Sequence, residues 1–381
     1  MRIDMSNDFD VVIIGSGLSG AMLAAILAKH GVDVVLIDSG THPRFAVGES
    51  TIPHMSLLLS VLAERYGVPE IEHLAYPDRV AQSVCSTCGI KRAFGFAYHR
   101  PGKIYDPTEG VQFGTGSKDE NHFFRQDIDA FLFHTALHYG AAARQNTVVT
   151  AVEIDEGGVT IRTADGQEIH ARYVVDAAGH KSVLGRFFGL EETPTRFKHH
   201  SRSIFTHMID VPPFDESGNP MTVSWHQSTL HHVFERGWFW VIPFNNRDGS
   251  TNPLISVGLT VDPRRYPKPS IAPDREFQQF LSLFPSVARQ FADAKSVRPW
   301  VSTGRLQYST TRCVGYRYCL MSHAAGFIDP LFSRGMINTV EVIYALLPPS
   351  CRLSEITTTV RSLLHQSNIS SSGSSTTTIA W

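Results

Sequence analysis

The sequence predicts an α/β fold in which a parallel sheet forms one domain and an antiparallel sheet forms a second, smaller domain. At the N-terminus an apolar strand pattern, a glycine-rich turn and a helix pattern follow one another. In the middle of the chain, strand-like runs alternate with turns rich in proline and glycine. The length of 381 residues suffices for two domains with a sizeable core.

The N-terminal elements have the order strand, turn, helix, strand. Residues 10–14 are a continuous apolar run, which is typical of a parallel strand buried on both faces. The glycine-rich turn follows at once, and residues 21–29 favour a helix that ends at Gly31. A second apolar run over residues 33–38 predicts the next strand, which ends on an acid.

The turn has the spacing GxGxxG and lies between a strand and a helix, which is the context of a dinucleotide site. Gly15 permits the tight turn, Gly17 lets a pyrophosphate approach the backbone, and Gly20 lets the helix pack on the sheet. The helix N-terminus supplies amides and the positive end of the helix dipole. Asp38 can accept hydrogen bonds from ribose hydroxyls. The alternative is a tight strand–helix turn that binds nothing.

The later elements complete the two predicted domains. A helix is expected from about Asp127 to Gly140, and a small meander with a return strand over 148–179. A last buried strand and a final helix are expected over 318–323 and 336–347. The predicted boundaries are 9–196 with 301–347 for the first domain, 197–300 for the antiparallel domain, and 351–381 for a low-complexity tail that we expect to be disordered.

Composition excludes several classes of protein. The 34 Lys and Arg against 36 Asp and Glu give a net charge of −2, without the basic excess of a nucleic-acid binder. The acidic N-terminus has no secretory signal pattern, and serines and glycines interrupt the longest apolar stretch, 11–28. Five cysteines suit a reducing compartment. We therefore expect a cytoplasmic protein without membrane or nucleic-acid partners.

Two patterns raise the possibility of a metal site. Cys85 and Cys88 could form half of a zinc site or a redox pair, but no second pair of ligands completes four. The histidine pairs 199–200 and 231–232 lie in strand-like runs, where neighbouring side chains point to opposite faces. The sequence thus predicts no metal.

Six motifs in this order resemble those of the flavin-dependent halogenases. They are the GxGxxG turn, HPRFAVGESTIP (42–53), HFFRQD (122–127), VVDAAG (174–179), GWFWVIP (237–243) and GFIDPLFSRG (326–335). The sequence most resembles the free-standing members that chlorinate phenolic polyketides such as tetracyclines, a role in antibiotic biosynthesis. The resemblance implies a Rossmann-like FAD-binding domain of the glutathione reductase and p-hydroxybenzoate hydroxylase type, together with an antiparallel substrate domain.

The resemblance also assigns residues to the FAD. It places the ADP part at the glycine turn and Asp38, and Asp329 against the ribityl chain. The full set of implied cofactor residues is Gly15, Ser16, Gly17, Gly20, Asp38, Arg44, Glu49, Ser50, Arg125 and Asp329.

The reaction implied by the resemblance converts halide to hypohalous acid with reduced FAD and oxygen, and a lysine then delivers the halogen to an electron-rich ring. The matching residue is Lys91. If its segment is a strand, alternation places Lys91 on one face with Ala93, Gly95 and Ala97 only, which leaves room beside the ammonium. Burial there lowers the lysine pKa. The alternative is an exposed lysine at a strand edge.

Further residues are implied to control halide and substrate. Arg334 and Gly335 match the halide site. Trp238 and Trp240 share a face by period two, and two indoles near the flavin would keep an organic ring away from it. Phe332 stands where tryptophan halogenases carry a glutamate, which favours a phenolic substrate. Pro243 completes the implied gating set of Trp238, Trp240, Pro243 and Phe332.

The expected function is therefore an FADH2-dependent chlorination of an aromatic small molecule, with chloride as co-substrate. A second glycine-rich motif is missing, so a separate NAD(P)H-dependent flavin reductase is expected to supply the reduced FAD. Two alternatives stay open at this point. One is an FAD-dependent aromatic monooxygenase or reductase of the same fold. The other is a truncated FAD-binding protein with impaired activity, because the family pattern ends near residue 345.

Overall fold

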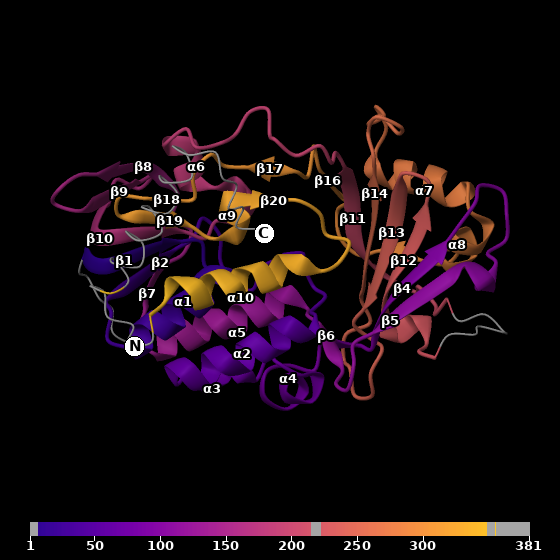
Figure 1. The fold of residues 1–381 in the computed structure, drawn as a ribbon, viewed down its shortest axis with the longest axis horizontal. Coiled ribbons are helices and arrows are strands. Elements are labelled where there is room, and N and C mark those ends of the chain that lie inside the picture. The colour runs from indigo at the N-terminus through magenta and orange to yellow at the C-terminus, as the bar shows by residue number, and fades with distance from the viewer. Residues whose placement is uncertain (1–6, 215–221, 349–354, 356–381) are drawn as a thin grey trace, which may run out of the picture.

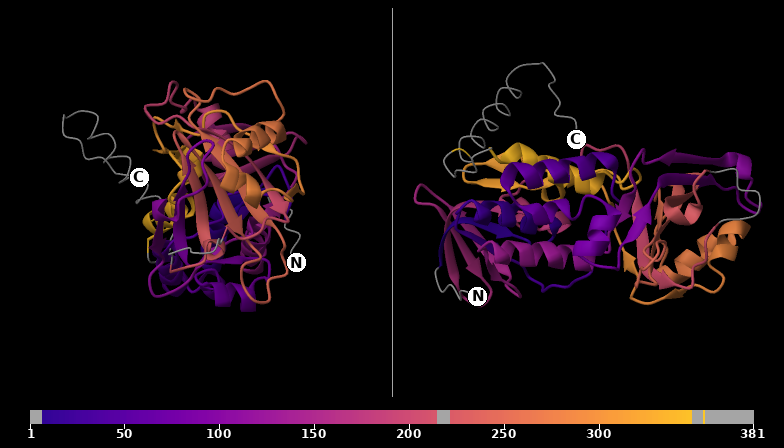
Figure 2. Two further views of the ribbon diagram at one scale, coloured as in Figure 1. Left: turned by 90° about the vertical axis from the view of Figure 1, so that its right-hand side faces the viewer. Right: turned by 90° about the horizontal axis from the view of Figure 1, so that it is seen from below.

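The structure is a computed structural model that describes residues 7–214, 222–348 and 355. Its strands form two large sheets that lie next to each other along the long axis of the molecule (Figure 1). The right-hand view of Figure 2 shows the same elongated arrangement from below. The predicted disorder of residues 351–381 falls, apart from residue 355, outside the described residues.

The first sheet contains the predicted parallel strands. Strand β1 pairs in parallel with β2 and with β10, and β10 pairs in parallel with β19. Nearly all side chains of β1 and β2 are buried, as the continuous apolar runs predict. The members are β1 (Asp8–Ile14), β2 (Val34–Ile37), β7 (Ala142–Arg144), β8 (Val149–Ile154), β9 (Val159–Thr163), β10 (Glu168–Asp176), β18 (Val314–Gly315) and β19 (Tyr318–Leu320).

A helical layer packs on the first sheet. The helix α1 (Leu18–Lys29) is buried over most of its length and lies against α5 (Arg125–His138) and α10 (Arg334–Leu346). These three helices lie side by side with α2 (Pro53–Tyr66) in Figure 1. The sequence analysis identified α1, α5 and α10 to within a few residues. Four shorter helices also belong to this half of the molecule: α3 (Pro69–Glu72), α4 (Pro77–Ser83), α6 (Val183–Phe187) and α9 (Ser322–Ala325).

The second sheet is antiparallel except for one pair, because β4 runs parallel to β12. Its order is β15 (Lys295–Ser296), β11 (Arg202–Ile209), β14 (Ile255–Val261), β13 (Gly237–Pro243), β12 (Ser228–Phe234), β4 (Ala93–Tyr98) and β5 (Gly110–Gly114), with β16 (Val301–Ser302) beside β11. Strands β4 and β5 belong to this sheet although they lie within residues 9–196. The domain boundaries themselves stay a prediction.

Two helices cover one face of the second sheet. Phe277 of α7 (Pro273–Ser282) and Val287 of α8 (Pro285–Gln290) are fully buried in the same core as Phe239 and Val241 of β13. The other face of β13 is turned toward the first domain. There Trp240 packs against the core that contains the buried side chains of α1 and α5. The second sheet therefore presents its uncovered side to the predicted cofactor domain.

Short elements join the two halves. The strand β3 (Gly89–Lys91) pairs with β6 (Glu120–His122), and β17 (Tyr308–Ser309) pairs with β20 (Gly326–Phe327). Single 3-10 turns are η1 (Pro107–Glu109), η2 (Gly179–Lys181) and η3 (Trp225–Gln227). Over the ranges that the structure describes, no helix combines the length and apolarity needed to cross a membrane.

Candidate cofactor and catalytic site

The glycine-rich turn has a backbone that only glycine permits. Gly15 has φ +103°, and a Cβ on it would lie 2.5 Å from the Ala177 carbonyl oxygen. A Cβ on Gly20 would lie 1.9 Å from the carbonyl oxygen of Gly15. Gly17 caps α1 without a side chain of its own, so the first amides of the helix face the turn.

Asp38 lies directly after β2 and organises the turn. Its Oδ2 accepts hydrogen bonds from the amide and hydroxyl of Ser16, each at 2.8 Å, and from Arg44 at 2.8 Å. Its Oδ1 accepts from the Gly40 amide at 2.9 Å. Burial opposes ionisation, but the Ser16 bonds and the Arg44 charge outweigh it and lower the pKa of Asp38. Because a carboxylate oxygen has two lone pairs, Oδ1 can still accept a ribose hydroxyl.

Three buried polar atoms around this turn indicate that a polar ligand belongs there. Ser19 Oγ, His42 Nδ1 and Arg44 Nε have no hydrogen-bond partner within the described part of the chain. Buried polar atoms are almost always paired in folded proteins. Together with the glycine cradle, the Ser19 and Arg44 donors fit a diphosphate, and His42 Nδ1, an acceptor because Nε2 donates to the Ser16 carbonyl oxygen, fits a ribose hydroxyl.

Arg125, the first residue of α5, ties the loop before α2 to this helix. It makes a two-pronged ion pair with the buried Asp129, at 2.8 and 3.0 Å. Its Nη1 donates to the carbonyl oxygens of Val47 and Gly48. The guanidinium that the resemblance places along the cofactor therefore shapes the loop over residues 42–50.

Glu49 connects the same loop to the second sheet. One carboxylate oxygen lies 3.1 Å from His207 Nε2 on β11, and the other accepts from Ser256 Oγ on β14 at 2.8 Å. Glu49 is 3% exposed. Trp240 Nε1 donates to the same Ser256 hydroxyl at 3.3 Å, so Ser256 links the predicted cofactor residue to the predicted gating residue.

We expect Glu49→Ala to lower the free energy of unfolding by about 1–3 kcal/mol, because it leaves the buried His207 and Ser256 without their acceptor. Glu49→Gln is the matched control, since it keeps one acceptor oxygen and the side-chain volume. Urea unfolding of both variants measures the difference. Equal stability of Glu49→Ala and the parent chain would contradict this role of the carboxylate.

Lys91, the last residue of β3, is fully buried. Its Nζ donates to Ser50 Oγ and to the Thr51 carbonyl oxygen, both at 2.8 Å. Burial lowers the pKa of Lys91 well below its ordinary value, and the nearby Glu120 only partly offsets this effect. Burial likewise raises the pKa of Glu120. Two hydrogen bonds therefore hold the Lys91 nitrogen in place, and burial disfavours its charged form.

The surroundings of Lys91 differ from the prediction that it shares its face with small residues only. Its Nζ lies 3.3 Å from the centre of the Phe94 ring. The reason is that the strand breaks at Arg92, where the chain leaves β6 and joins β12. The alternation of side chains between the two faces of a strand does not continue across such a break. Phe94 therefore faces the Lys91 nitrogen.

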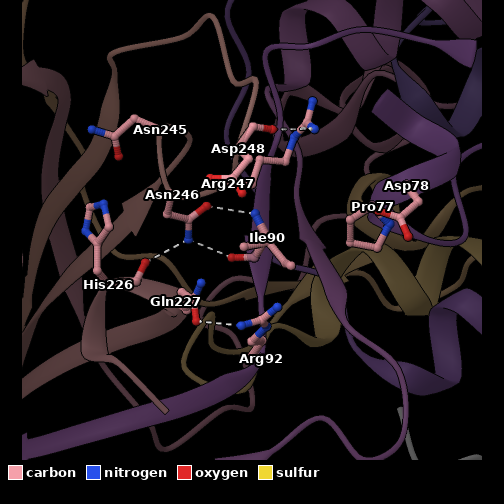
Figure 3. Close-up of a pocket in the computed structure, with 10 residues that line it drawn as sticks. All are labelled: Pro77, Asp78, Ile90, Arg92, His226, Gln227, Asn245, Asn246, Arg247 and Asp248. Atoms are coloured by element: carbon pink, nitrogen blue, oxygen red, sulfur yellow. Dashed lines mark hydrogen bonds between the residues drawn. The ribbon is translucent and has the colours of Figure 1, made fainter. Parts of the chain in front are cut away.

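The opposite side of β3 is held by an asparagine in a polar pocket of about 440 Å³ (Figure 3). Asn246 accepts from the Ile90 amide at 2.8 Å and donates to the Ile90 carbonyl oxygen at 2.7 Å. Its side chain also donates to the His226 carbonyl oxygen. Asn246 thus makes the two hydrogen bonds to Ile90 that a neighbouring strand would make. It thereby holds the backbone next to Lys91.

The tryptophans of β13 lie on one face, as predicted. Trp238 and Trp240 are half-buried and alternate with the buried Phe239 and Val241. Gly258 on β14 makes room for the indole, since a Cβ there would lie 2.2 Å from the Trp240 ring. At the end of the strand, the Pro243 carbonyl oxygen lies 3.0 Å from His122 Nδ1.

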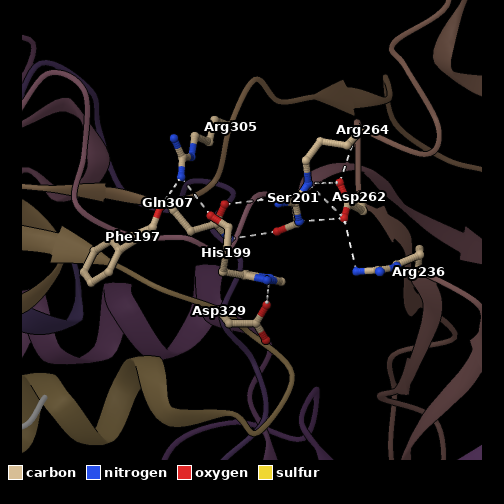
Figure 4. A network of polar contacts seen from close by, with 9 residues as sticks. All are labelled: Phe197, His199, Ser201, Arg236, Asp262, Arg264, Arg305, Gln307 and Asp329. Carbon is tan, nitrogen blue, oxygen red and sulfur yellow. Dashed lines mark hydrogen bonds and ion pairs between the residues drawn. The ribbon is translucent and has the colours of Figure 1, made fainter.

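Asp329 lies in the loop between β20 and α10, within a polar network (Figure 4). Its Oδ2 is 2.9 Å from His199 Nε2, and its Oδ1 accepts from the Leu331 amide. Burial raises the pKa of Asp329, partly opposed by the Leu331 bond and by His199. Gln307 holds the loop by donating to the Ile328 carbonyl oxygen at 2.7 Å.

Arg334 and Gly335 form the first turn of α10. Arg334 Nη2 lies 3.5 Å from Glu341 on the same helix, and its side chain is half exposed. A Cβ on Gly335 would lie 3.0 Å from His323 Nε2. Phe332, just before this helix, is 59% exposed and lies 6.1 Å from the Phe96 ring.

The structure brings the predicted residues together in three groups. The glycine turn joins Asp38 and Arg44, Ser50 joins Lys91, and Asp329 lies in the loop that leads into the predicted halide residues at the start of α10. The sequence analysis missed the residues that hold these groups in place: Thr51, Glu120, Asn246, His207 and Ser256. Ser256 carried a signal, because it is a polar residue inside an apolar strand pattern.

The sequence and the fold match a known family of proteins. A family model described as "FAD binding domain" matches residues 8–269. Tetracycline 7-halogenase of Kitasatospora aureofaciens is 54% identical over 346 residues, covering 89% of this chain and 62% of that protein. Monodechloroaminopyrrolnitrin halogenase PrnC of Pseudomonas fluorescens is 50% identical over 90% of this chain and 61% of its own length.

A solved structure extends the likeness to three dimensions. The halogenase PltM, in complex with phloroglucinol and FAD, superposes with a TM-score of 0.87 at 39% identity, over 93% of this chain and 70% of that one. The chain belongs to the family of FAD-binding halogenases. It spans about three fifths of the length of the two curated relatives.

Proposed function

We propose that this chain catalyses FADH2-dependent chlorination of a phenolic or similarly electron-rich aromatic compound, with Lys91 as the residue that holds the activated halogen. The observation that carries the proposal is the buried Lys91 amine, hydrogen-bonded to Ser50 and Thr51 and facing an aromatic ring.

The residues around the glycine turn would hold the FAD. Gly15, Gly17 and the N-terminus of α1 would bind the diphosphate, and Asp38 with Arg44 the adenosine ribose. Reduced FAD supplies the electrons with which oxygen and chloride give hypochlorous acid. Trp238 and Trp240 present two indoles on the face toward the first domain, where they would keep an organic ring away from that reaction.

The Lys91 amine would then accept chlorine from hypochlorous acid. The amine nitrogen forms an N–Cl bond, the Cl–O bond breaks, and a proton from the nitrogen leaves with the hydroxide as water. Only the unprotonated amine has the lone pair that this step requires, so burial assists it by lowering the lysine pKa. Ser50 and Thr51 fix the position of the nitrogen.

An aromatic surface beside the lysine supports an aromatic substrate. The Phe96 ring lies 6.5 Å from Phe94, 6.0 Å from Phe113 and 6.1 Å from Phe332. These spacings are in the range of favourable ring contacts. Phe113 and Phe332 are 57% and 59% exposed. A substrate ring would stack on this surface, which Phe94 connects to Lys91.

The remaining partners follow from the same proposal. Arg334 and Gly335, at the N-terminus of α10, would bind chloride, because that helix end carries partial positive charge. A separate NAD(P)H-dependent reductase would supply reduced FAD, and the expected location is the cytoplasm.

The test is incubation of the chain with FAD, a flavin reductase, NADH, chloride and phloroglucinol. A product with the isotope pattern of chlorine supports the proposal. A hydroxylated product would identify a monooxygenase, and release of hydrogen peroxide alone would identify an FAD-binding protein without halogenating activity. Either of these two results would overturn the proposal.

Phe332→Glu tests the substrate class. We expect this variant to keep its phenol activity within about tenfold and to gain no activity on tryptophan, because Phe332 is exposed and one carboxylate does not build an indole pocket. The measurement is product formation with phloroglucinol and with tryptophan in parallel. Efficient tryptophan chlorination by the variant would contradict the assignment.

A further inference from the structure

Two cysteines lie next to each other immediately before the strand that carries Lys91. Cys85 follows α4 and is half-buried, whereas Cys88 precedes β3 and is 2% exposed. Both are free thiols, and their sulfur atoms are 3.6 Å apart. The sulfurs of a disulfide are about 2.05 Å apart, so closure needs a movement of only about 1.6 Å.

The two thiols have opposite acidities. Hydrogen bonds from Cys88 and Thr87 lower the pKa of Cys85 to about 6, although burial and the charge of Asp127 oppose this shift. Burial raises the pKa of Cys88, and so does its hydrogen bond to Cys85. The more accessible thiol is thus the nucleophile, and the buried one stays protonated.

We propose that Cys85 and Cys88 form a redox-active dithiol that an oxidant of the peroxide class closes into a reversible disulfide. This inference does not depend on the halogenation reaction. The alternative of a metal site lacks ligands, since the described residues contain no group of three or more side chains placed to hold a metal.

The chemistry balances in two steps. The Cys85 thiolate attacks an oxygen of hydrogen peroxide, the O–O bond breaks, and hydroxide leaves, which gives a sulfenic acid. The Cys88 sulfur then attacks Cys85, the S–O bond breaks, and the Cys88 proton leaves with the hydroxyl group as water. In total, two thiols and one peroxide give one disulfide and two water molecules.

Neighbouring residues hold both the sulfur and the backbone of Cys88. The sulfur of Cys88 accepts a hydrogen bond from the Phe124 amide at 3.2 Å, and its carbonyl oxygen accepts from Arg247 at 3.0 Å. The intervening Thr87 is held through its carbonyl oxygen by Asn252. The Cys85 amide donates to the Val80 carbonyl oxygen at 2.9 Å. Closure therefore moves the half-buried Cys85 side chain, rather than its backbone, toward Cys88.

The experiment uses the purified full chain, reduced with dithiothreitol and then treated with one equivalent of hydrogen peroxide. We expect two thiols to disappear together, peptide mapping to place a disulfide between Cys85 and Cys88, and dithiothreitol to restore both thiols. A disulfide between other cysteines, or no change at this pair, would overturn the proposal. These measurements need no substitution and so cannot fail through misfolding.

Substitutions test the different roles of the two cysteines, with Cys85 as the attacking thiol and Cys88 as the resolving thiol. Cys88→Ala should stop at the Cys85 sulfenic acid, which dimedone traps, and Cys85→Ser should leave Cys88 unoxidised. Cys313→Ser, at a half-buried cysteine elsewhere, is the matched control and should behave like the parent chain. The pH midpoint of Cys85 alkylation should lie near 6 and rise in Cys88→Ala toward the ordinary value of about 8.5. An unchanged midpoint would contradict the assigned pair.

Discussion

Lys91→Met lowers the rate of product chlorination by about a hundredfold or more, a loss typical of removing one group that acts directly on the reacting atoms. The methionine fills most of the volume of the buried lysine, so the loss reports the missing amine rather than a cavity. Oxidation of reduced flavin continues, because the hydrogen bonds of the glycine turn and the Asp38 cluster do not involve Lys91, and the Ser50 hydroxyl keeps its contact with Thr229 Oγ1 at 2.7 Å.

The measurement compares chlorinated product with oxygen consumed in the same assay. Lys91→Arg is the second variant, since it keeps a positive charge but offers no free amine at neutral pH. Both variants should consume oxygen without chlorinating the phenol. If either keeps the parent ratio of product to oxygen, Lys91 does not hold the halogen.

The same lysine gives stability a dependence on pH with a definite sign. Burial lowers the pKa of Lys91 in the folded chain, whereas in the unfolded chain it is about 10.4. Between these two values the unfolded state binds more protons, so the free energy of unfolding rises with pH over this range. Lys91→Met lacks this contribution. The parent chain should therefore gain stability relative to the variant as the pH is raised, which urea unfolding at several pH values measures.

The cofactor end of the site could be predicted from the sequence because its signals are local. The turn from Gly15 to Gly20 and the acid Asp38 lie within one strand–helix–strand unit, and their chemistry follows from backbone sterics. The fold class followed from apolar runs in the same way. Strand β1 and helix α1 differ from the prediction by two or three residues at their ends.

The environment of Lys91 could not be predicted, because it depends on contacts distant in sequence. Ser50 and Thr51 reach the ammonium from the loop before α2, and Asn246 holds β3 from a loop of the second sheet. The break at Arg92, which turns Phe94 toward the amine, is set by where the chain changes partner strands. No periodic pattern of apolar residues marks the position at which the chain changes its partner strand.

The residues that hold the predicted site in place escaped the sequence analysis for the same reason. Glu49 was assigned to the cofactor through its motif, but its carboxylate is held by His207 and Ser256 of the second sheet. These hydrogen bonds join the loop that contains Glu49 to strands distant in the sequence. They can be found only when the loop and the second sheet are placed relative to each other. Glu49 therefore combines a predicted cofactor contact with the observed contact to the second sheet.

Gly20→Ala weakens FAD binding by at least about tenfold and lowers the free energy of unfolding by about 3 kcal/mol, the upper end of the usual cost of overpacking a buried site. The added Cβ would lie 1.9 Å from the Gly15 carbonyl oxygen, which is backbone and cannot rotate away. Either α1 moves off the sheet or the turn opens, and both displace the helix amides from the diphosphate position. An affinity loss of at least about tenfold follows from a misplacement costing about 1.4 kcal/mol.

Gly304→Ala is the control, because a Cβ at Gly304 meets nothing within 4 Å and its φ needs no glycine. Titration with FAD, followed by flavin fluorescence, measures the affinity, and urea unfolding without FAD measures the stability. The two readouts separate the causes. A variant that is destabilised but binds FAD like the Gly304→Ala control would mean that the turn only packs the helix. Equal loss in both means that packing and cofactor binding depend on the same contact between Gly15 and Gly20.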